Sequence, residues 1–150
     1  MIAHLRRTLA VVLFTLCQFA GVQFAHATQY SFFGPIASDT TWADTVTVNG
    51  DVVITPTGHL HLSPGTHVRF QPRSSIYDDL DGNQFRCDVI VKGALSVDGG
   101  VAPTDAVVFT SSAQNPAGGD WGYVYFKPES RDDISSITGA SFRFGMENVY

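Results

Sequence analysis

Short alternating runs of apolar residues, each followed by a turn that often contains glycine, recur along most of the chain. The runs lie at 52–54, 60–62, 68–70, 89–91, 95–97 and 107–110. Strands this short form no stable hairpin sheet alone, but they are stabilised when the chain coils and each strand pairs with its counterpart one coil further on. The pattern therefore predicts an all-β solenoid whose coils stack around a continuous core.

The alternation within these runs predicts which side chains face the core, because successive residues of a strand point to opposite sides. Val53, His61 and Arg69 are expected to point outward. Gly58 and Gly65 fall at the corners of the predicted coil, where a sharp turn often requires a positive φ. The side chains expected to point inward are Val52, Ile54, Leu60, Leu62, Val68 and Phe70.

Residues 50–150 are predicted to form about three coils, interrupted by a polar insertion loop at 71–87 and by a second loop at 111–120. The preceding segment, 28–49, begins with aromatic and turn residues, and we expect its part at 30–42 to be irregular. The open end of a solenoid exposes apolar layers and unpaired strand edges. The segment 28–49 is therefore predicted to be the N-terminal cap.

Residues 1–27 have the pattern of a cleavable signal peptide. Arg6 and Arg7 precede an apolar stretch at 8–24, and an A-x-A cleavage site follows at 25–27. A membrane-spanning anchor is the alternative, but the apolar stretch is shorter than the roughly 20 residues that a span needs. We therefore expect a protein that begins at Thr28, is secreted or exposed at the cell surface, and has no membrane span after cleavage.

Loss of this segment leaves seven basic and fourteen acidic side chains, because Arg6 and Arg7 are removed from the nine basic residues of the full chain. The resulting formal charge of −7 argues against nucleic acid or an anionic membrane as a partner, since both are bound through basic surfaces. Cys87 is then the remaining cysteine. It is expected to be a small buried residue or, alternatively, a thiol that pairs with another chain.

Several stretches together resemble one family of repeat proteins. GDVVI at 50–54, PGTHVRF at 64–70 and GDWG at 119–122 are similar to motifs of secreted bacterial right-handed parallel β-helix repeat proteins. The resemblance covers most of residues 44–144 and departs from the family at Tyr123, where a second glycine is common. It implies a right-handed parallel β-helix that is often the N-terminal portion of a longer protein. Residues 142–150 read as the start of another coil, which leads to the same expectation.

The insertion loop contains a cluster of side chains with oxygen ligands, Asp78, Asp79, Asp81 and Asn83. Calcium takes several oxygen ligands from a flexible loop, so this cluster is a candidate calcium site. The EF-hand pattern is not met, because Gln84 stands where that loop needs glycine. A solvated acidic turn is the alternative, since Asp, Asn and Gly favour turns. No other cofactor is expected.

His59 and His61 lie two residues apart on the outward side of one predicted strand, and His67 precedes the next run. Two imidazoles at this spacing resemble one half of a zinc site. No cysteine or carboxylate lies close to them in the sequence. Solvent-facing histidines are therefore the favoured interpretation.

The favoured function is a non-catalytic, structural or adhesive module, with extracellular glycans or cell-surface proteins as partners. Trp42, Trp121, Tyr123 and Tyr125 are candidate glycan contacts, because aromatic side chains stack on sugar rings. The alternative for these residues is that they fill or cap the core, and this alternative is favoured for Trp121.

A polysaccharide lyase or glycosidase is the alternative function, by analogy with enzymes that have this fold. Such chemistry requires a pair of carboxylates or a calcium-assisted base beside the scissile bond. Arg69, Lys92, Asp88 and Asp98 are expected on the outer strand face, but on different sides of the coil. No catalytic residue is therefore assigned.

Overall fold

The computed structural model describes residues 29–72, 85–146 and 149, with side chains described from Ser31 onward. Regular structure in these residues consists of eleven β-strands and one 3₁₀ turn, η1 (Pro103–Asp105). No helix among them has the length and apolar character needed to cross a membrane. The strands are β1 (Gln29–Ile36), β2 (Asp39–Trp42), β3 (Thr45–Ile54), β4 (His59–Leu62), β5 (His67–Phe70), β6 (Val89–Val91), β7 (Ala94–Asp98), β8 (Val107–Ser111), β9 (Val124–Phe126), β10 (Ser136–Thr138) and β11 (Ala140–Phe142).

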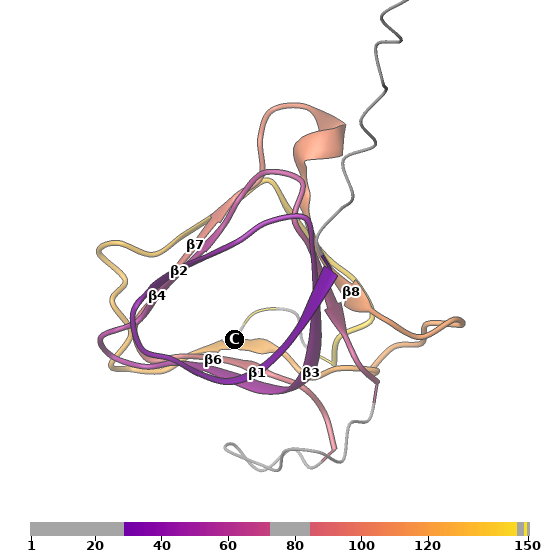
Figure 1. Ribbon diagram of the computed structural model, residues 1–150, viewed down its shortest axis with the longest axis horizontal. Coiled ribbons are helices and arrows are strands. Elements are labelled where there is room, and N and C mark those ends of the chain that lie inside the picture. Colours follow the sequence, from indigo (N-terminus) through magenta and orange to yellow (C-terminus); the bar gives the residue numbers. More distant parts are fainter. Residues whose placement is uncertain (1–28, 73–84, 147–148, 150) are drawn as a thin grey trace, which may run out of the picture.

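In the described part of the chain these strands pair with one another only in parallel. One sheet has the order β11-β8-β5-β3-β6-β9, with β1 also on β3, and the other has the order β10-β7-β4-β2. Figure 1 shows the chain winding around a three-sided outline, with β2, β4 and β7 together along one side. The prediction of a mostly β chain made of stacked parallel strands is confirmed.

The side chains predicted to face inward are buried, with at most 1% of their surface exposed. Val53, His61 and Arg69, which were predicted to face outward, lie half-buried at the surface of the sheets. The alternation pattern therefore assigns the two sides of these strands correctly.

Aromatic rings continue the core from one coil to the next. The Phe70 ring stacks on the Trp121 ring, with centroids 4.3 Å apart and planes inclined by 9°. Phe109 stacks on Phe142 in the same way, at 4.5 Å. Rings of this size bury a large apolar area, so these contacts stabilise the stacking of coils in addition to the backbone hydrogen bonds.

The segment 30–42 is regular, which corrects the expectation of an irregular stretch. β1 and β2 pair in parallel with β3 and β4, and Trp42 is paired with Leu62. Phe32 packs edge-on against the Trp42 ring, with centroids 5.4 Å apart. The turn-rich composition hid these strands because strand formation depends on the neighbouring strand and on burial more than on local propensity. The role of this segment as an end cover stays a prediction.

Cys87 lies where the two described ends of the insertion meet. Its Sγ is 3.4 Å from the carbonyl oxygen of Gln71, and its side chain has no exposed surface. The expectation of a small buried residue is confirmed, and within the described residues the thiol is free. Burial raises the pKa of this thiol to about 12, and the nearby carboxylates of Asp51 and Asp88 act in the same direction.

Two aspartates form a repeating contact at the corner that precedes β6. The Asp51 carboxylate accepts a hydrogen bond from the backbone N–H of Asp88 at 3.1 Å, and the Asp88 carboxylate accepts one from the N–H of Tyr123 at 2.7 Å. Asp88 is fully buried, which corrects its expected place on the outer strand face. Each carboxylate satisfies a backbone donor of the next coil, so these side chains help to fix the register between coils.

Gly58 and Gly65 form corners for different physical reasons. Gly65 has a positive φ of 77°, as expected for a tight turn. Gly58 does not have a positive φ, but a Cβ at this position would collide with the carbonyl oxygen of Ile36 in the preceding coil. The N–H of Ala94 donates to the Gly58 carbonyl oxygen at 3.1 Å from the other side. Gly58 is therefore needed for the close approach of successive coils.

We expect Gly58→Ala to lower the free energy of unfolding by about 1–3 kcal/mol, because the added methyl group must push two backbone segments apart. Denaturant titration followed by circular dichroism measures this loss. Gly118→Ala is the matched control, since an added Cβ at Gly118 has nothing within 4 Å. The control should leave stability unchanged or raise it by up to about 1 kcal/mol. Equal losses in the two variants would contradict this explanation.

We expect the Cys87 thiol to resist alkylation in the folded protein at about pH 8, because a pKa of about 12 leaves almost no thiolate. Mass spectrometry after iodoacetamide treatment should show labelling of Cys87 only when denaturant is present. Rapid labelling of the folded protein, or a dimer linked through Cys87, would show instead that the thiol is accessible.

Candidate functional site

The outward side of the sheet β10-β7-β4-β2 carries a ladder of polar side chains. Its strands lie in register, so Thr41 is paired with His61, His61 with Ser96, and Ser96 with Ser136. Neighbouring strands of a sheet lie about 4.8 Å apart, so the side chains of paired residues can meet. All of these residues are at least partly exposed. By contrast, Leu60 and Leu62, which flank His61 on β4, are buried.

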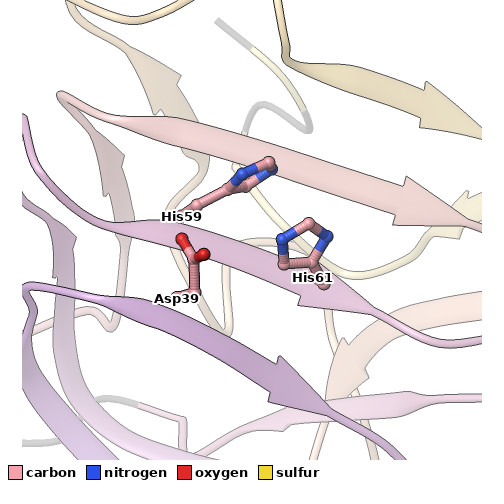
Figure 2. A group of neighbouring side chains, drawn as sticks. All are labelled: Asp39, His59 and His61. Carbon is pink, nitrogen blue, oxygen red and sulfur yellow. The ribbon is translucent and has the colours of Figure 1, made fainter.

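Asp39, His59 and His61 come together on this polar ladder (Figure 2). The register places Asp39 of β2 directly beside His59 of β4, and His61 follows on the same side of β4. One carboxylate oxygen and one nitrogen of each imidazole lie within 4.8 Å of one another. The two imidazole rings have centroids 3.8 Å apart and planes inclined by 32°.

A neighbour in the next coil holds the His59 ring. The distance from His59 Nε2 to Ser96 Oγ is 2.8 Å, and the Ser96 hydroxyl donates to the carbonyl oxygen of Ile134 at 3.3 Å. A hydroxyl has a single proton to donate, so when that proton is in the bond to Ile134, Nε2–H of His59 is the donor to Ser96. In that tautomer the lone pair of His59 lies on Nδ1.

The surroundings favour the neutral form of His59. Burial lowers the pKa of His59 below its ordinary value, His61 and Arg131 act in the same direction, and Asp39 opposes them. A neutral imidazole is the form that binds metal ions. The cluster therefore offers two nitrogen donors and a carboxylate, a set that suits zinc and related divalent ions.

The sequence alone does not identify the carboxylate partner of the two histidines. Asp39 precedes His59 by 20 residues, and the pairing of β2 with β4 brings the two together. One feature of the sequence could have indicated this contact. Positions 39–41 precede positions 59–61 by about the length of one coil, so the two segments can lie side by side. His67, the third histidine considered, is exposed on β5 in the other sheet.

A second candidate surface lies on the outward side of β3, β6 and β9. Val53, Ile90 and Tyr125 occupy paired positions there and form an apolar column, in which Val53 and Tyr125 are partly exposed and Ile90 between them is buried, with 1% of its surface exposed. The Tyr123 ring meets the Tyr125 ring edge to face, with centroids 5.8 Å apart. Together with Lys92 and Lys127, these residues form a surface that we call the tyrosine face.

The two lysines border the apolar column of the tyrosine face. Lys92 and Lys127 each come one residue after the paired ends of β6 and β9, so they lie in neighbouring coils at the same position. Lys127 Nζ lies 3.9 Å from the centroid of the Tyr125 ring, which is a cation–π contact. A hollow of about 170 Å³ is lined by Val53, Ile90, Lys92 and Lys127.

Two of the four candidate aromatic contacts are core residues, which is the favoured interpretation for Trp121 and corrects the assignment of Trp42 as a glycan contact. Trp42 is 1% exposed and Trp121 is fully buried. The indole N–H of Trp121 donates to the carbonyl oxygen of Arg143 at 2.8 Å, so its polar atom is satisfied inside the protein. Tyr123 and Tyr125 are partly exposed and remain candidates for ligand contact.

The predicted calcium ligands Asp78, Asp79, Asp81 and Asn83 lie outside the described residues, as does the predicted signal peptide. The structure therefore adds nothing to either prediction.

The residues considered for polysaccharide chemistry do not converge. Arg69 lies on β5, Lys92 follows β6, and Asp98 ends β7, so the three occupy different strands of the coil. Asp88 is buried at a corner, where it binds backbone. These four residues do not form a catalytic pair.

Comparison of the chain with protein-family models, with curated proteins and with solved structures gave no match. The resemblance to β-helix repeat proteins therefore stays a prediction. A functional conclusion has to come from the chemistry of the Asp39-His59-His61 cluster and of the tyrosine face.

Proposed function

We propose that the chain is a secreted right-handed parallel β-helix that serves as a non-catalytic surface module and binds extracellular glycans through its tyrosine face. Support for the coiled architecture comes from the sheet order, in which β4 lies on β2, β7 on β4 and β10 on β7. Right-handed winding is expected because crossovers between parallel strands are right-handed in about 98% of cases. Secretion is supported by the charged and apolar pattern of residues 1–27.

The position of Tyr125 carries the glycan-binding proposal. Its partly exposed ring continues the apolar column formed by Val53 and Ile90. The two lysines of this acidic chain lie beside that column. An aromatic ring next to polar groups suits the apolar face and the hydroxyl groups of a sugar. The lysines add affinity for sugars that carry a carboxylate.

The hollow is smaller than a typical pocket for a small molecule. Pockets that enclose small molecules typically have volumes of about 300–1,000 Å³, whereas this hollow has about 170 Å³. It therefore fits one part of a longer ligand. The strands below it fix the spacing of the side chains, so a ligand can meet Tyr125 and the two lysines without reorganisation of the backbone.

We expect Tyr125→Ala to weaken glycan binding by about 1 kcal/mol, close to a fivefold rise in Kd, because a stacking surface is lost. Tyr125→Phe is the matched control, since it keeps the ring. Affinity electrophoresis in gels that contain neutral polymers or polyuronates such as pectin and alginate measures the change. Equal retention of wild type and Tyr125→Ala on every polymer would contradict the assignment to this face.

We expect Lys127→Ala to weaken binding of polyuronates more than binding of neutral polymers, and the effect should decrease with added salt. Arg69→Ala is the control, because Arg69 lies on β5 and the substitution removes a positive charge that is not part of the tyrosine face. Incubation of the wild-type protein with the same polymers tests the alternative function, a lyase or a glycosidase. Release of unsaturated or reducing ends by the wild-type protein would show that it is a lyase or a glycosidase.

A further inference from the structure

We propose that Asp39, His59 and His61 bind one divalent metal ion of the zinc class on the outward side of the sheet β10-β7-β4-β2. The ion joins β2 to β4 and therefore links two successive coils. This site and the tyrosine face lie on different sheets. The two proposals can therefore be tested separately.

The donor atoms select the class of ion. Imidazole nitrogens suit zinc, copper and nickel, whereas calcium and magnesium take oxygen ligands. Two imidazoles and one carboxylate supply three protein ligands, which leaves one position of a tetrahedral site open for water or for a group from a partner. The excess of acidic residues in the chain also favours the approach of a cation.

The backbone brings the three ligands close to binding geometry. In a tetrahedral zinc site with bonds of about 2.0–2.1 Å, neighbouring donor atoms lie roughly 3.3 Å apart. The donor atoms of this cluster lie within 4.8 Å of one another, so the side chains must close by about 1.5 Å or less. Asp39 is exposed and both histidines are partly exposed, so side-chain rotation can supply this movement while the paired strands stay in place (Figure 2).

Ser96 is a positioning residue for this site. Its hydroxyl oxygen lies 2.8 Å from His59 Nε2, and the tautomer with the proton on Nε2 leaves Nδ1 to bind the ion. Histidine ligands commonly donate their second nitrogen to such a partner, and loss of the partner typically lowers metal affinity by about 10–100-fold. The cluster thus has a supporting contact as well as three ligands.

Calorimetric titration of the protein, purified without a polyhistidine tag, with Zn²⁺ tests the proposal. We expect saturable binding of one zinc ion that an excess of Ca²⁺ or Mg²⁺ does not displace. Zinc should also raise the Tm by several degrees, because an ion that binds the folded state stabilises it. A protein that shows no saturable zinc binding, or that releases zinc to equimolar Ca²⁺, overturns the proposal.

Substitutions locate the ion. Asp39→Asn, His59→Ala and His61→Ala should each weaken zinc binding by at least about 100-fold and abolish the rise in Tm, while Ser96→Ala should weaken binding by about tenfold or more. His67→Ala and Asp98→Asn are matched controls outside the cluster and should bind like wild type. Asp39→Asn keeps the size of the side chain, and circular dichroism checks the fold of every variant. Wild-type binding by folded Asp39→Asn and His61→Ala proteins would show that the ion is held elsewhere.

Discussion

The parallel hydrogen-bonded ladder between successive coils is the constraint on which the structure depends. Each strand finds its partner in another turn of the chain, so one coil cannot bury its apolar residues alone. Side chains alternate along a strand, so a slip of one residue would turn Val52 and Ile54 out of the core and bring Val53 into it. The core and both candidate surfaces therefore depend on the same register.

Contacts at the corners add to the register that the paired strands set. Gly58 allows the backbone to pass close to the carbonyl oxygen of Ile36. The buried carboxylates of Asp51 and Asp88 accept hydrogen bonds from the backbone of the following coil. Misregistered coils would leave these buried groups without partners, and that cost is about 1–3 kcal/mol for each unsatisfied hydrogen-bonding group. These contacts add to the resistance to slippage that the buried apolar side chains already provide.

Both candidate surfaces are columns that run across the coils. Tyr125 gains apolar neighbours because Val53 and Ile90 occupy the same position in other coils. His59 gains a carboxylate from one adjacent coil and a hydroxyl from the other. Parallel strands in register can therefore assemble a site from residues that are far apart in the sequence. The two columns lie on separate sheets, so the molecule can present two distinct surfaces at once.

The sequence by itself determined the β class and the inward side of the apolar runs at 52–54, 60–62 and 68–70, because alternation is a local property. It could not identify the strands in 30–42 or the burial of Asp88, since their stabilisation comes from another coil. Tertiary structure also decided that Trp42 fills the core and that Asp39 lies beside His59. The physical reason is that strand pairing in this chain joins residues 16 to 41 positions apart, and the lengths of the intervening turns set which residues meet.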